Sequence, residues 1–331
     1  MTGKRELSGE DRLIERFFKP LAAHPGALAL SDDAACLTPP VGHDLVLTAD
    51  MVVAGVHFFA TDPAETIGKK ALRVNLSDLA AKGAEPVGAL MTISFQGRAD
   101  ESWIEKFAQG LGEDCVAYGC PLLGGDTTKT PGPLSISITA IGKVPAGKMV
   151  RRAGAKPGDL VVVSGTIGDG ALGLKALRSG AMLGGLTREQ TNELIRRYRV
   201  PEPKLALAPL LREYASAAMD VSDGLVGDLG KLAANSGVAA SVEVAKIPLS
   251  NPAYEALETV PALLQDVLTG GDDYEVLAAI PEARFPAFAE AAGRAGVPVT
   301  AIGRFSPGEG IRVIGLRGEE LSFAKNAYSH F

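Results

Sequence analysis

Six short acidic clusters, each next to glycine, alanine or serine, constrain the fold of this 331-residue chain more than any other feature. Several follow apolar, strand-like runs: Asp50 comes after residues 45–47, and Asp272 comes after Val267-Leu268. A carboxylate at a strand end, beside small residues that let a ligand approach the backbone, is the hard oxygen ligand that Mg²⁺ prefers. For any single cluster the alternative is an ordinary turn or helix cap. Together they favour a site for a highly charged metal–phosphate substrate. The clusters are residues 31–35, 48–50, 75–78, 124–128, 219–224 and 270–274.

The composition favours a layered α/β protein of two domains. A hydrophobic content of 46% with 22% charged residues excludes a disordered chain, and 331 residues suffice for two domains. Abundant alanine and glycine with only 5% aromatic residues favour close-packed α/β layers over an all-β sandwich. The net charge of −6 argues against nucleic acid as the main partner, since no basic stripe is available for its phosphates. An anionic protein that binds anionic phosphates needs metal ions as intermediaries.

The cysteines and the first residues bear on the cellular compartment. Cys36, Cys115 and Cys120 show no C-x-x-C spacing, so we expect neither structural zinc nor a disulfide framework. Residues 1–11 are polar and charged, without the apolar core of a signal peptide. No apolar run reaches the ~18–20 residues that a membrane span needs. We therefore expect a reduced, cytoplasmic protein with no membrane partner.

Apolar spacing predicts alternating strands and helices. A long helix is predicted over residues 63–83, beginning near a proline and turning Leu72, Leu76 and Leu79 to the core. The composition changes over residues 147–158, which predicts a domain boundary there. The predicted domains are an N-terminal domain over residues 1–149 and a C-terminal α/β domain over residues 150–331. Other predicted elements are strands at 44–48, 51–56, 87–95, 159–164 and 274–280 and helices at 99–118, 170–179, 188–197 and 286–296, with 221–235 continuing the alternation.

Familiar nucleotide motifs do not account for the clusters. No Walker A loop and no protein-kinase signature occur in the chain. Residues 164–173 form a glycine-rich stretch after a valine-rich strand, but their spacing is not G-x-G-x-x-G, and close helix–strand packing also needs glycines. His57 is either a structural histidine or a site residue. Arg151 and Arg152 are either a solvated pair or phosphate ligands.

The clusters, taken in order, resemble the thiamine-monophosphate kinase family, which belongs to a superfamily with aminoimidazole ribonucleotide synthetase and selenophosphate synthetase. The resemblance covers nearly the whole chain. The motifs that carry it are residues 32–35, 50–58, 74–81, 124–128, 152–159, 220–225, 270–275 and 328–331. It implies an α/β fold with mixed (α+β) sheets in two domains, the first for ATP, metal and dimer contacts, with its sheets forming a barrel across a homodimer.

The resemblance also implies the site residues. The implied Mg²⁺ ligands are Asp33, Thr48, Ala49, Asp50, Asp78, Asp126, Asp220 and Asp223. The implied ATP contacts are Gly125, Asp126, Arg152 and Ser222. The implied contacts to thiamine phosphate are His57, Asp272 and Tyr328. This chain has Ala49 where the family often has threonine, so only a backbone carbonyl could bind metal there, and Asp272 where the family often has the longer glutamate.

The implied reaction is ATP-dependent phosphorylation of thiamine monophosphate to thiamine diphosphate, with several Mg²⁺ ions. Its nucleophile is a phosphate oxygen whose second pKa is about 6, so it is largely deprotonated at neutral pH and no general base is assigned. A sister enzyme making selenophosphate is disfavoured, because residues 1–30 contain no cysteine, and a hydrogenase-maturation relative would end in cysteine rather than Phe331. An imidazole-ring-closing sister enzyme and a non-catalytic metal–nucleotide-binding protein remain as alternatives.

Overall fold

The computed structural model describes residues 12–97, 100–323 and 327. Contacts divide the chain into two compact units. The first unit comprises residues 1–76 and 86–143, and the second comprises residues 77–85 and 144–331. The helix α2 (Ala64–Ala81) therefore contributes its last turn, from Ser77 on, to the second unit.

The first unit is built on a four-stranded sheet with the order β1-β4-β2-β3, in which β2 and β3 run parallel. Its strands are β1 (His43–Val53), β2 (Glu85–Gln96), β3 (Leu122–Thr130) and β4 (Ser135–Pro145). The two strands predicted at 44–48 and 51–56 are one continuous strand. The acidic cluster between them holds no glycine or proline that would end a strand, so the extended backbone runs through Asp50.

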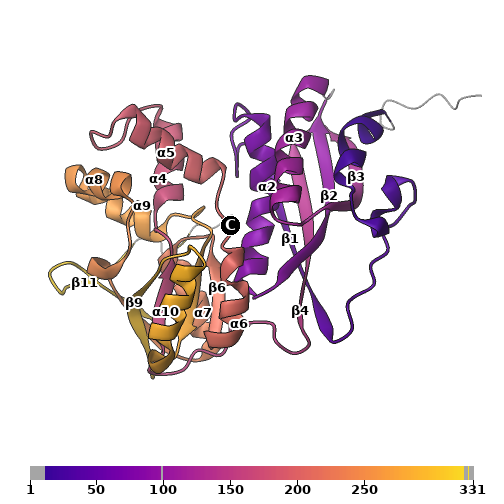
Figure 1. Ribbon diagram of the computed structural model, residues 1–331. Coiled ribbons are helices and arrows are strands. Elements are labelled where there is room, and N and C mark those ends of the chain that lie inside the picture. The colour runs from indigo at the N-terminus through magenta and orange to yellow at the C-terminus, as the bar shows by residue number, and fades with distance from the viewer. Residues whose placement is uncertain (1–11, 98–99, 324–326, 328–331) are drawn as a thin grey trace, which may run out of the picture. The chain divides into compact units, whose positions relative to one another are not determined.

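Two helices, α2 and α3 (Glu101–Ala117), accompany this sheet (Figure 1). Phe95 of β2 meets the ring of Trp103 edge-on at 6.2 Å, and Trp103 stacks on Phe107 at 5.2 Å. The guanidinium of Arg73 on α2 donates to both carboxylate oxygens of Asp114 on α3, which joins the two helices. The helix predicted over residues 63–83 is α2, and its Leu72, Leu76 and Leu79 are all fully buried, as expected.

The opposite face of the same sheet is only partly covered. Along β1 the buried Val46 and Val52 alternate with Leu47, which is 62% exposed, and Met51, which is 55% exposed. Residues of the 3₁₀ segment η3 (Pro25–Leu30) pack with the strands at one part of this face, in a small cluster of Ala27, Leu123 and Ile141. The sheet therefore keeps large apolar side chains on a face that this unit does not bury.

The second unit is built on a seven-stranded sheet with the order β11-β10-β7-β9-β5-β8-β6. β7 and β10 pair in parallel, whereas the other neighbouring pairs are antiparallel, so the mixed sheet expected from the sequence is confirmed. The strands are β5 (Leu160–Ser164), β6 (Ala217–Val221), β7 (Ala239–Glu243), β8 (Glu275–Ile280), β9 (Val299–Ser306), β10 (Ile311–Ile314) and β11 (Glu320–Leu321).

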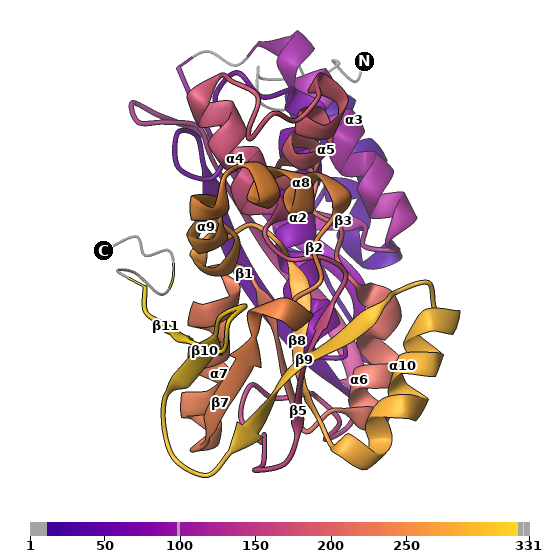
Figure 2. The ribbon, with the colours of Figure 1, turned by 90° about the vertical axis from the view of Figure 1, so that its left-hand side faces the viewer.

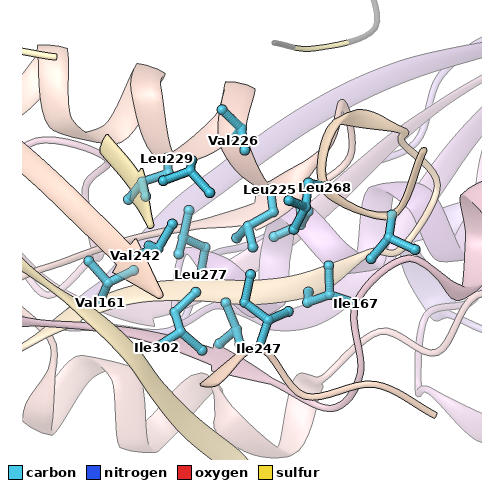
Figure 3. Close-up of a cluster of buried hydrophobic side chains, with 14 of the residues drawn as sticks. Val161, Ile167, Leu225, Val226, Leu229, Val242, Ile247, Leu268, Leu277 and Ile302 are labelled. Carbon is cyan, nitrogen blue, oxygen red and sulfur yellow. The ribbon is translucent and has the colours of Figure 1, made fainter. Parts of the chain in front are cut away.

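Helices cover both faces of this sheet. Successive side chains of β5 point to opposite faces and therefore enter different cores. Val161 and Val163 belong to a large core, shown in Figure 3, whereas Val162 belongs to a smaller core with α6 and α10. Figure 2 shows α6 and α10 on the side of the sheet away from α7. The helices are α4 (Asp169–Ser179), α5 (Arg188–Arg199), α6 (Ala208–Tyr214), α7 (Leu225–Ser236), α8 (Asn251–Thr259), α9 (Leu264–Thr269) and α10 (Phe285–Arg294).

Two sequence expectations in this unit were wrong. The apolar pair Val267-Leu268 is not a strand but lies in α9, where both side chains are fully buried. With Leu264 the pair has the i, i+3, i+4 spacing that places apolar residues on one side of a helix. Residues 221–235 were expected to form one element. Instead Val221 is the last residue of β6, and α7 begins only at Leu225. Across the described residues, no helix has both the length and the apolar character needed to cross a membrane.

Candidate functional site

The end of β6 and the turn that follows it carry three of the predicted site residues, Asp220 in the strand and Ser222 and Asp223 in the turn. Its shape is set by Asp228 in the first turn of α7, whose Oδ2 accepts the backbone N–H groups of Ser222 and Asp223, each at 2.9 Å. The side chain of Asp228 is fully buried, and burial raises its pKa while a 2.8 Å hydrogen bond from Lys231 opposes that rise. Asp228 was not foreseen. A carboxylate in the first turn of the following helix is the signal that could have identified it.

The loop over residues 270–274 lies directly beside this turn. The N–H of Asp272 donates to the carbonyl of Ser222 at 3.0 Å, and the N–H of Tyr274 donates to the carbonyl of Val221 at 2.8 Å. A Cβ on Gly271 would lie 2.2 Å from the Ser222 carbonyl oxygen, so only glycine allows this approach. The fifth and sixth acidic clusters, far apart in the sequence, are therefore neighbours in the second unit.

The last turn of α2 joins the same assembly. The Ser77 hydroxyl donates to Asp220 Oδ2 at 2.9 Å, and Asp220 is almost fully buried. Lys82 donates from Nζ to the carbonyl of Ala218 at 2.7 Å. Burial lowers the pKa of Lys82, and the neighbouring charges of Asp220 and Asp78 partly oppose this. The third cluster thus meets the fifth, and the partly buried ammonium group of Lys82 lies near their carboxylates.

The segment that carries Arg152 is anchored at two points of the second unit. The N–H groups of Gly154 and Ala155 both donate to the Ser236 hydroxyl oxygen at 3.1 Å. The carbonyl of Arg151 accepts the N–H of Ala218 at 2.9 Å. Arg152 itself is exposed, and its charge contributes to the lowered pKa of Lys82, which places a second cation near Lys82.

In the first unit, β1 presents the second acidic cluster. Thr48 and Asp50 lie on the face of the strand that buries Val46, and the Asp50 N–H donates to Asn75 Oδ1 on α2 at 3.0 Å. Ala49 lies on the other, exposed face. The methyl side chain of Ala49 supplies no donor oxygen, so its backbone carbonyl is the only group there that could bind a cation.

His57 follows β1 and is held through both its ring and its backbone. Its Nδ1 accepts the N–H of Val53 at 3.1 Å, and its carbonyl accepts from Lys70 Nζ at 2.9 Å. Because Nδ1 acts as an acceptor, the neutral ring carries its hydrogen on Nε2. The ring orientation of His57 is thus fixed by the end of β1.

The remaining predicted residues of the first unit are exposed. Asp126 lies on β3 opposite Thr92 of β2, and the preceding Gly125 has φ 151°. A Cβ on Gly125 would lie 1.7 Å from the Met91 carbonyl oxygen, so strand pairing alone requires glycine there. Asp33 lies in an exposed segment, where its N–H donates to Asp32 Oδ1 at 2.8 Å.

The predicted metal ligands are divided between the two units, with Asp33, Thr48, Ala49, Asp50 and Asp126 in the first and Asp78, Asp220 and Asp223 in the second. Within residues 12–97, 100–323 and 327, no three His, Cys, Asp or Glu side chains are grouped so that they could hold an ion. Asp50 on β1 and Asp126 on β3 lie on opposite edge strands of the four-stranded sheet. The donor chemistry, carboxylate oxygens without a histidine–cysteine cluster, still fits Mg²⁺. Tyr328 lies outside the described residues.

A buried ion network next to this assembly was missed by the sequence analysis. Arg197 of α5 contacts Glu275 at 2.8 Å, Glu202 at 2.9 Å and Asp169 at 3.6 Å. Lys204 lies 3.2 Å from the same Glu275 carboxylate, which is fully buried. Burial alone would raise the pKa of Glu202, but a hydrogen bond from Arg196 and the charges of Arg197 and Lys204 lower it to about 2. The network ties α5 to the first residue of β8, directly after Tyr274.

The fold and the clustered carboxylates define the class of protein. Models of the AIR synthase related protein family match the chain, the N-terminal domain model over residues 31–144 and the C-terminal domain model over residues 156–315. A curated thiamine-monophosphate kinase from Caulobacter vibrioides is 42% identical over 321 residues, which cover 96% of this chain and 89% of the relative. The chain belongs to the thiamine-monophosphate kinase family.

Solved structures agree with this assignment. A crystal structure of thiamine-monophosphate kinase from Stenotrophomonas maltophilia K279a superposes with a TM-score of 0.83 at 39% identity, covering 96% of this chain and 98% of that one. A structure described as AaThiL complexed with AMPPCP and TMP superposes with a TM-score of 0.78 at 31% identity, covering 99% of this chain and 100% of that one. The two-domain α/β architecture expected from the sequence is thereby confirmed.

Proposed function

We propose that this protein transfers the γ-phosphoryl group of ATP to thiamine monophosphate, giving ADP and thiamine diphosphate. One observation carries the proposal: in the second unit, the serine–aspartate end of α2, the β6–α7 turn and the loop at Asp272 come together through Ser77, Asp220 and Ser222. These are three of the motifs by which the chain resembles its family. The relative solved with AMPPCP and TMP supports the choice of both substrates.

The chemistry needs little from acid–base side chains. The attacking atom is an oxygen of the thiamine phosphate monoester, whose second pKa is about 6, so it is already deprotonated in most molecules at neutral pH. The obstacle is repulsion between two polyanions as they approach. Bound Mg²⁺ would neutralise phosphate charge. The residues of the chain then have to bind both polyanions, orient them in line and exclude water.

We assign roles to the residues on this basis. Lys82 and Arg152 add fixed positive charge beside Asp220, which favours phosphates at this place. His57 would donate from Nε2 to thiamine phosphate, and Asp272 would contact its polar groups. The proposed Mg²⁺ ligands are Asp33, Thr48, Ala49, Asp50, Asp78, Asp126, Asp220 and Asp223. The proposed ATP contacts are Gly125, Asp126, Arg152 and Ser222, and Tyr328 is kept as a third substrate contact.

We further propose that residues 1–149 form the ATP- and metal-binding, dimer-forming domain and residues 150–331 the C-terminal domain. The incompletely buried sheet face with Leu47 and Met51 supports a homodimer in which two four-stranded sheets close into a barrel. Closure would bring the edge strands of each sheet, which carry Asp50 and Asp126, to the edges of the partner's sheet. A cytoplasmic location fits an enzyme that uses ATP.

The test is direct. Purified protein is incubated with ATP, Mg²⁺ and thiamine monophosphate, and thiamine diphosphate and ADP are quantified. We expect stoichiometric formation of both, loss of turnover after chelation, and recovery with Mg²⁺ or Mn²⁺ but not Zn²⁺. An Asp78→Asn variant should lose turnover while keeping the fold. ATP consumption only with selenide or with an imidazole precursor would instead indicate a sister enzyme, and no turnover with any acceptor would indicate a binding protein.

A further inference from the structure

The glycine-rich start of α4 forms an anion-binding site that the chain itself fills. Gly168 precedes α4 with φ 92°, and no neighbouring side chain caps this helix. Backbone N–H groups at a helix N-terminus attract anions. Here the anion is the carboxylate of Asp273, whose Oδ2 accepts from Gly168 N at 2.7 Å and whose Oδ1 accepts from Gly170 N at 3.0 Å. Both oxygens are used, so this turn is not a place for a dinucleotide phosphate.

Asp273 is flanked by two residues with unfavourable backbone conformations. Asp272 has φ 71° and Tyr274 has φ 54°, in the left-handed region that residues other than glycine rarely adopt. Such conformations persist only where the surroundings fix them, and they concentrate at ligand-binding sites. The two side-chain hydrogen bonds of Asp273 act at the centre of this three-residue segment.

The same segment also contacts α4 through its backbone. A Cβ on Gly170 would lie 2.2 Å from the Asp272 carbonyl oxygen, so the first turn of α4 and the backbone of Asp272 are in close contact. On its other side the segment is hydrogen-bonded to Ser222 and Val221 of the β6–α7 turn. Asp273 therefore connects the α4 N-terminus to the turn that carries the proposed ATP and metal residues.

Asp273 is buried, and both of its carboxyl oxygens are held by backbone N–H groups. Its side chain is only 4% exposed, and burial raises its pKa well above the usual value, with the nearby Asp169 and Glu275 carboxylates adding to the rise. The two N–H donors of Gly168 and Gly170 oppose it. A buried side chain with both oxygens on backbone donors is suited to hold a loop in one conformation.

We propose that Asp273 is a positioning residue: its carboxylate occupies the N-terminal anion site of α4 and thereby holds Asp272 in the conformation that contacts thiamine phosphate. This inference rests on the proposed function for its kinetic readout. It does not place Asp273 in contact with substrate. If the proposal holds, loss of the carboxylate raises the KM for thiamine monophosphate and leaves the KM for ATP nearly unchanged.

The first test compares Asp273→Asn with the wild type. The amide keeps the size of the side chain but turns one acceptor into a donor that faces a backbone N–H. We expect the KM for thiamine monophosphate to rise about tenfold and the KM for ATP to change less than about twofold. The matched control is Asp266→Asn, which alters a partly exposed carboxylate paired with Lys175 and should leave both constants unchanged.

A second variant, Gly170→Ala, perturbs the loop over residues 270–274 without altering any carboxylate. In Gly170→Ala the new Cβ would displace the Asp272 backbone, so the same selective rise in KM is expected. Its control is Gly293→Ala in α10, where a Cβ would meet no atom within 4 Å. Amide hydrogen exchange at Gly168 and Gly170 gives a readout independent of turnover, and it should accelerate in Asp273→Asn.

The outcomes separate the two proposals. A wild type that does not phosphorylate thiamine monophosphate would refute the proposed function, whereas exchange would still report whether Asp273 holds the α4 turn. The positioning role would be overturned if the KM values for both substrates rose together, if neither changed, or if exchange at Gly168 and Gly170 were unaltered. A melting temperature lowered with unchanged KM values would likewise show a purely structural residue.

Discussion

Ser77 donates its hydroxyl hydrogen to the carboxylate of Asp220 across 2.9 Å, although the two residues are 143 positions apart in the chain. The bond joins the last turn of α2 to β6, and both groups are buried. It links the acidic cluster at residues 75–78 to the one at residues 219–224, so that a serine of the first cluster orients a carboxylate of the second. Charge-assisted hydrogen bonds of this kind are among the stronger ones in a protein interior.

Replacing Ser77 by alanine should therefore destabilise the second unit. The buried Asp220 carboxylate loses one donor, which we expect to lower the free energy of unfolding by about 1–3 kcal/mol. Chemical denaturation of wild type and variant measures the change. Ser179→Ala, which removes an exposed hydroxyl at the end of α4, is the control and should have little effect. Equal stability of the Ser77→Ala variant and the wild type would show that the bond contributes nothing.

Lys82 should weaken the binding of divalent ions at the neighbouring carboxylates. Its ammonium group, near Asp78 and Asp220, already supplies positive charge there. In Lys82→Met we expect the Mg²⁺ concentration for half-maximal thermal stabilisation to fall by roughly two- to fivefold. The measurement is the melting temperature over a Mg²⁺ titration without nucleotide. Lys175→Met, at a surface ion pair with Asp266, should leave the titration unchanged. An unchanged or weaker response in Lys82→Met would contradict this prediction.

The exposed face of β1 should carry the dimer contact. Introducing a charge at Leu47 places an unpaired carboxylate where we propose that the partner's sheet packs, which is strongly unfavourable when buried. We expect the wild type to sediment as a dimer and Leu47→Glu as a monomer at the same concentration. The control is Val116→Glu, at an 84% exposed apolar position on α3, which should remain dimeric. A monomeric wild type would reject the barrel.

Glu202 should contribute stability that depends on pH in a defined direction. Its pKa is about 2 in the folded protein against an ordinary value of 4.5, so the ionised form stabilises the fold. This contribution is complete above pH 4.5 and is lost progressively as the pH falls toward 2. The melting temperature of Glu202→Gln should thus be lower than that of the wild type at neutral pH and approach it in acid. A constant difference at all pH values would contradict this, and Glu290→Gln, in an exposed pair with Arg294, is the control.

The three cysteines should differ sharply in reactivity. Burial raises the pKa of Cys115 and of Cys120 to about 12, and the neighbouring Asp114 adds to the effect on Cys115, whereas Cys36 is exposed. Since the thiolate is the reactive form, a thiol reagent should modify one cysteine in the native protein and all three after unfolding. Cys36→Ser should abolish the native reaction. Rapid native modification of Cys115 would refute this assignment.

The sequence allowed good prediction where the determining interactions are local. The spacing of Leu72, Leu76 and Leu79 predicted α2 and its buried side, because helix periodicity depends on a few neighbouring positions. The acidic clusters were recognised for the same reason. The pair Val267-Leu268 was assigned to a strand because a two-residue apolar run fits a strand and a buried helix equally well.

What the sequence could not predict depends on contacts between distant segments. The carboxylate that fills the α4 N-terminus comes from Asp273, 105 residues after Gly168. Arg197 and Glu275, partners in the buried network, are 78 residues apart. The glycine spacing at the start of α4 spoke against a dinucleotide motif, but the sequence could not show that Asp273 occupies this helix N-terminus.

The guanidinium of Arg197 faces three carboxylates, on Asp169, Glu202 and Glu275, and the last two are shared with Lys204. Removing Arg197 would leave these three carboxylates with less compensating charge, and an uncompensated buried carboxylate costs more than the lost pair itself. Single substitutions in this group should therefore be tolerated poorly and should not add when combined. Over evolutionary time such positions can change only together, so across related chains their identities should vary as a correlated set rather than one at a time.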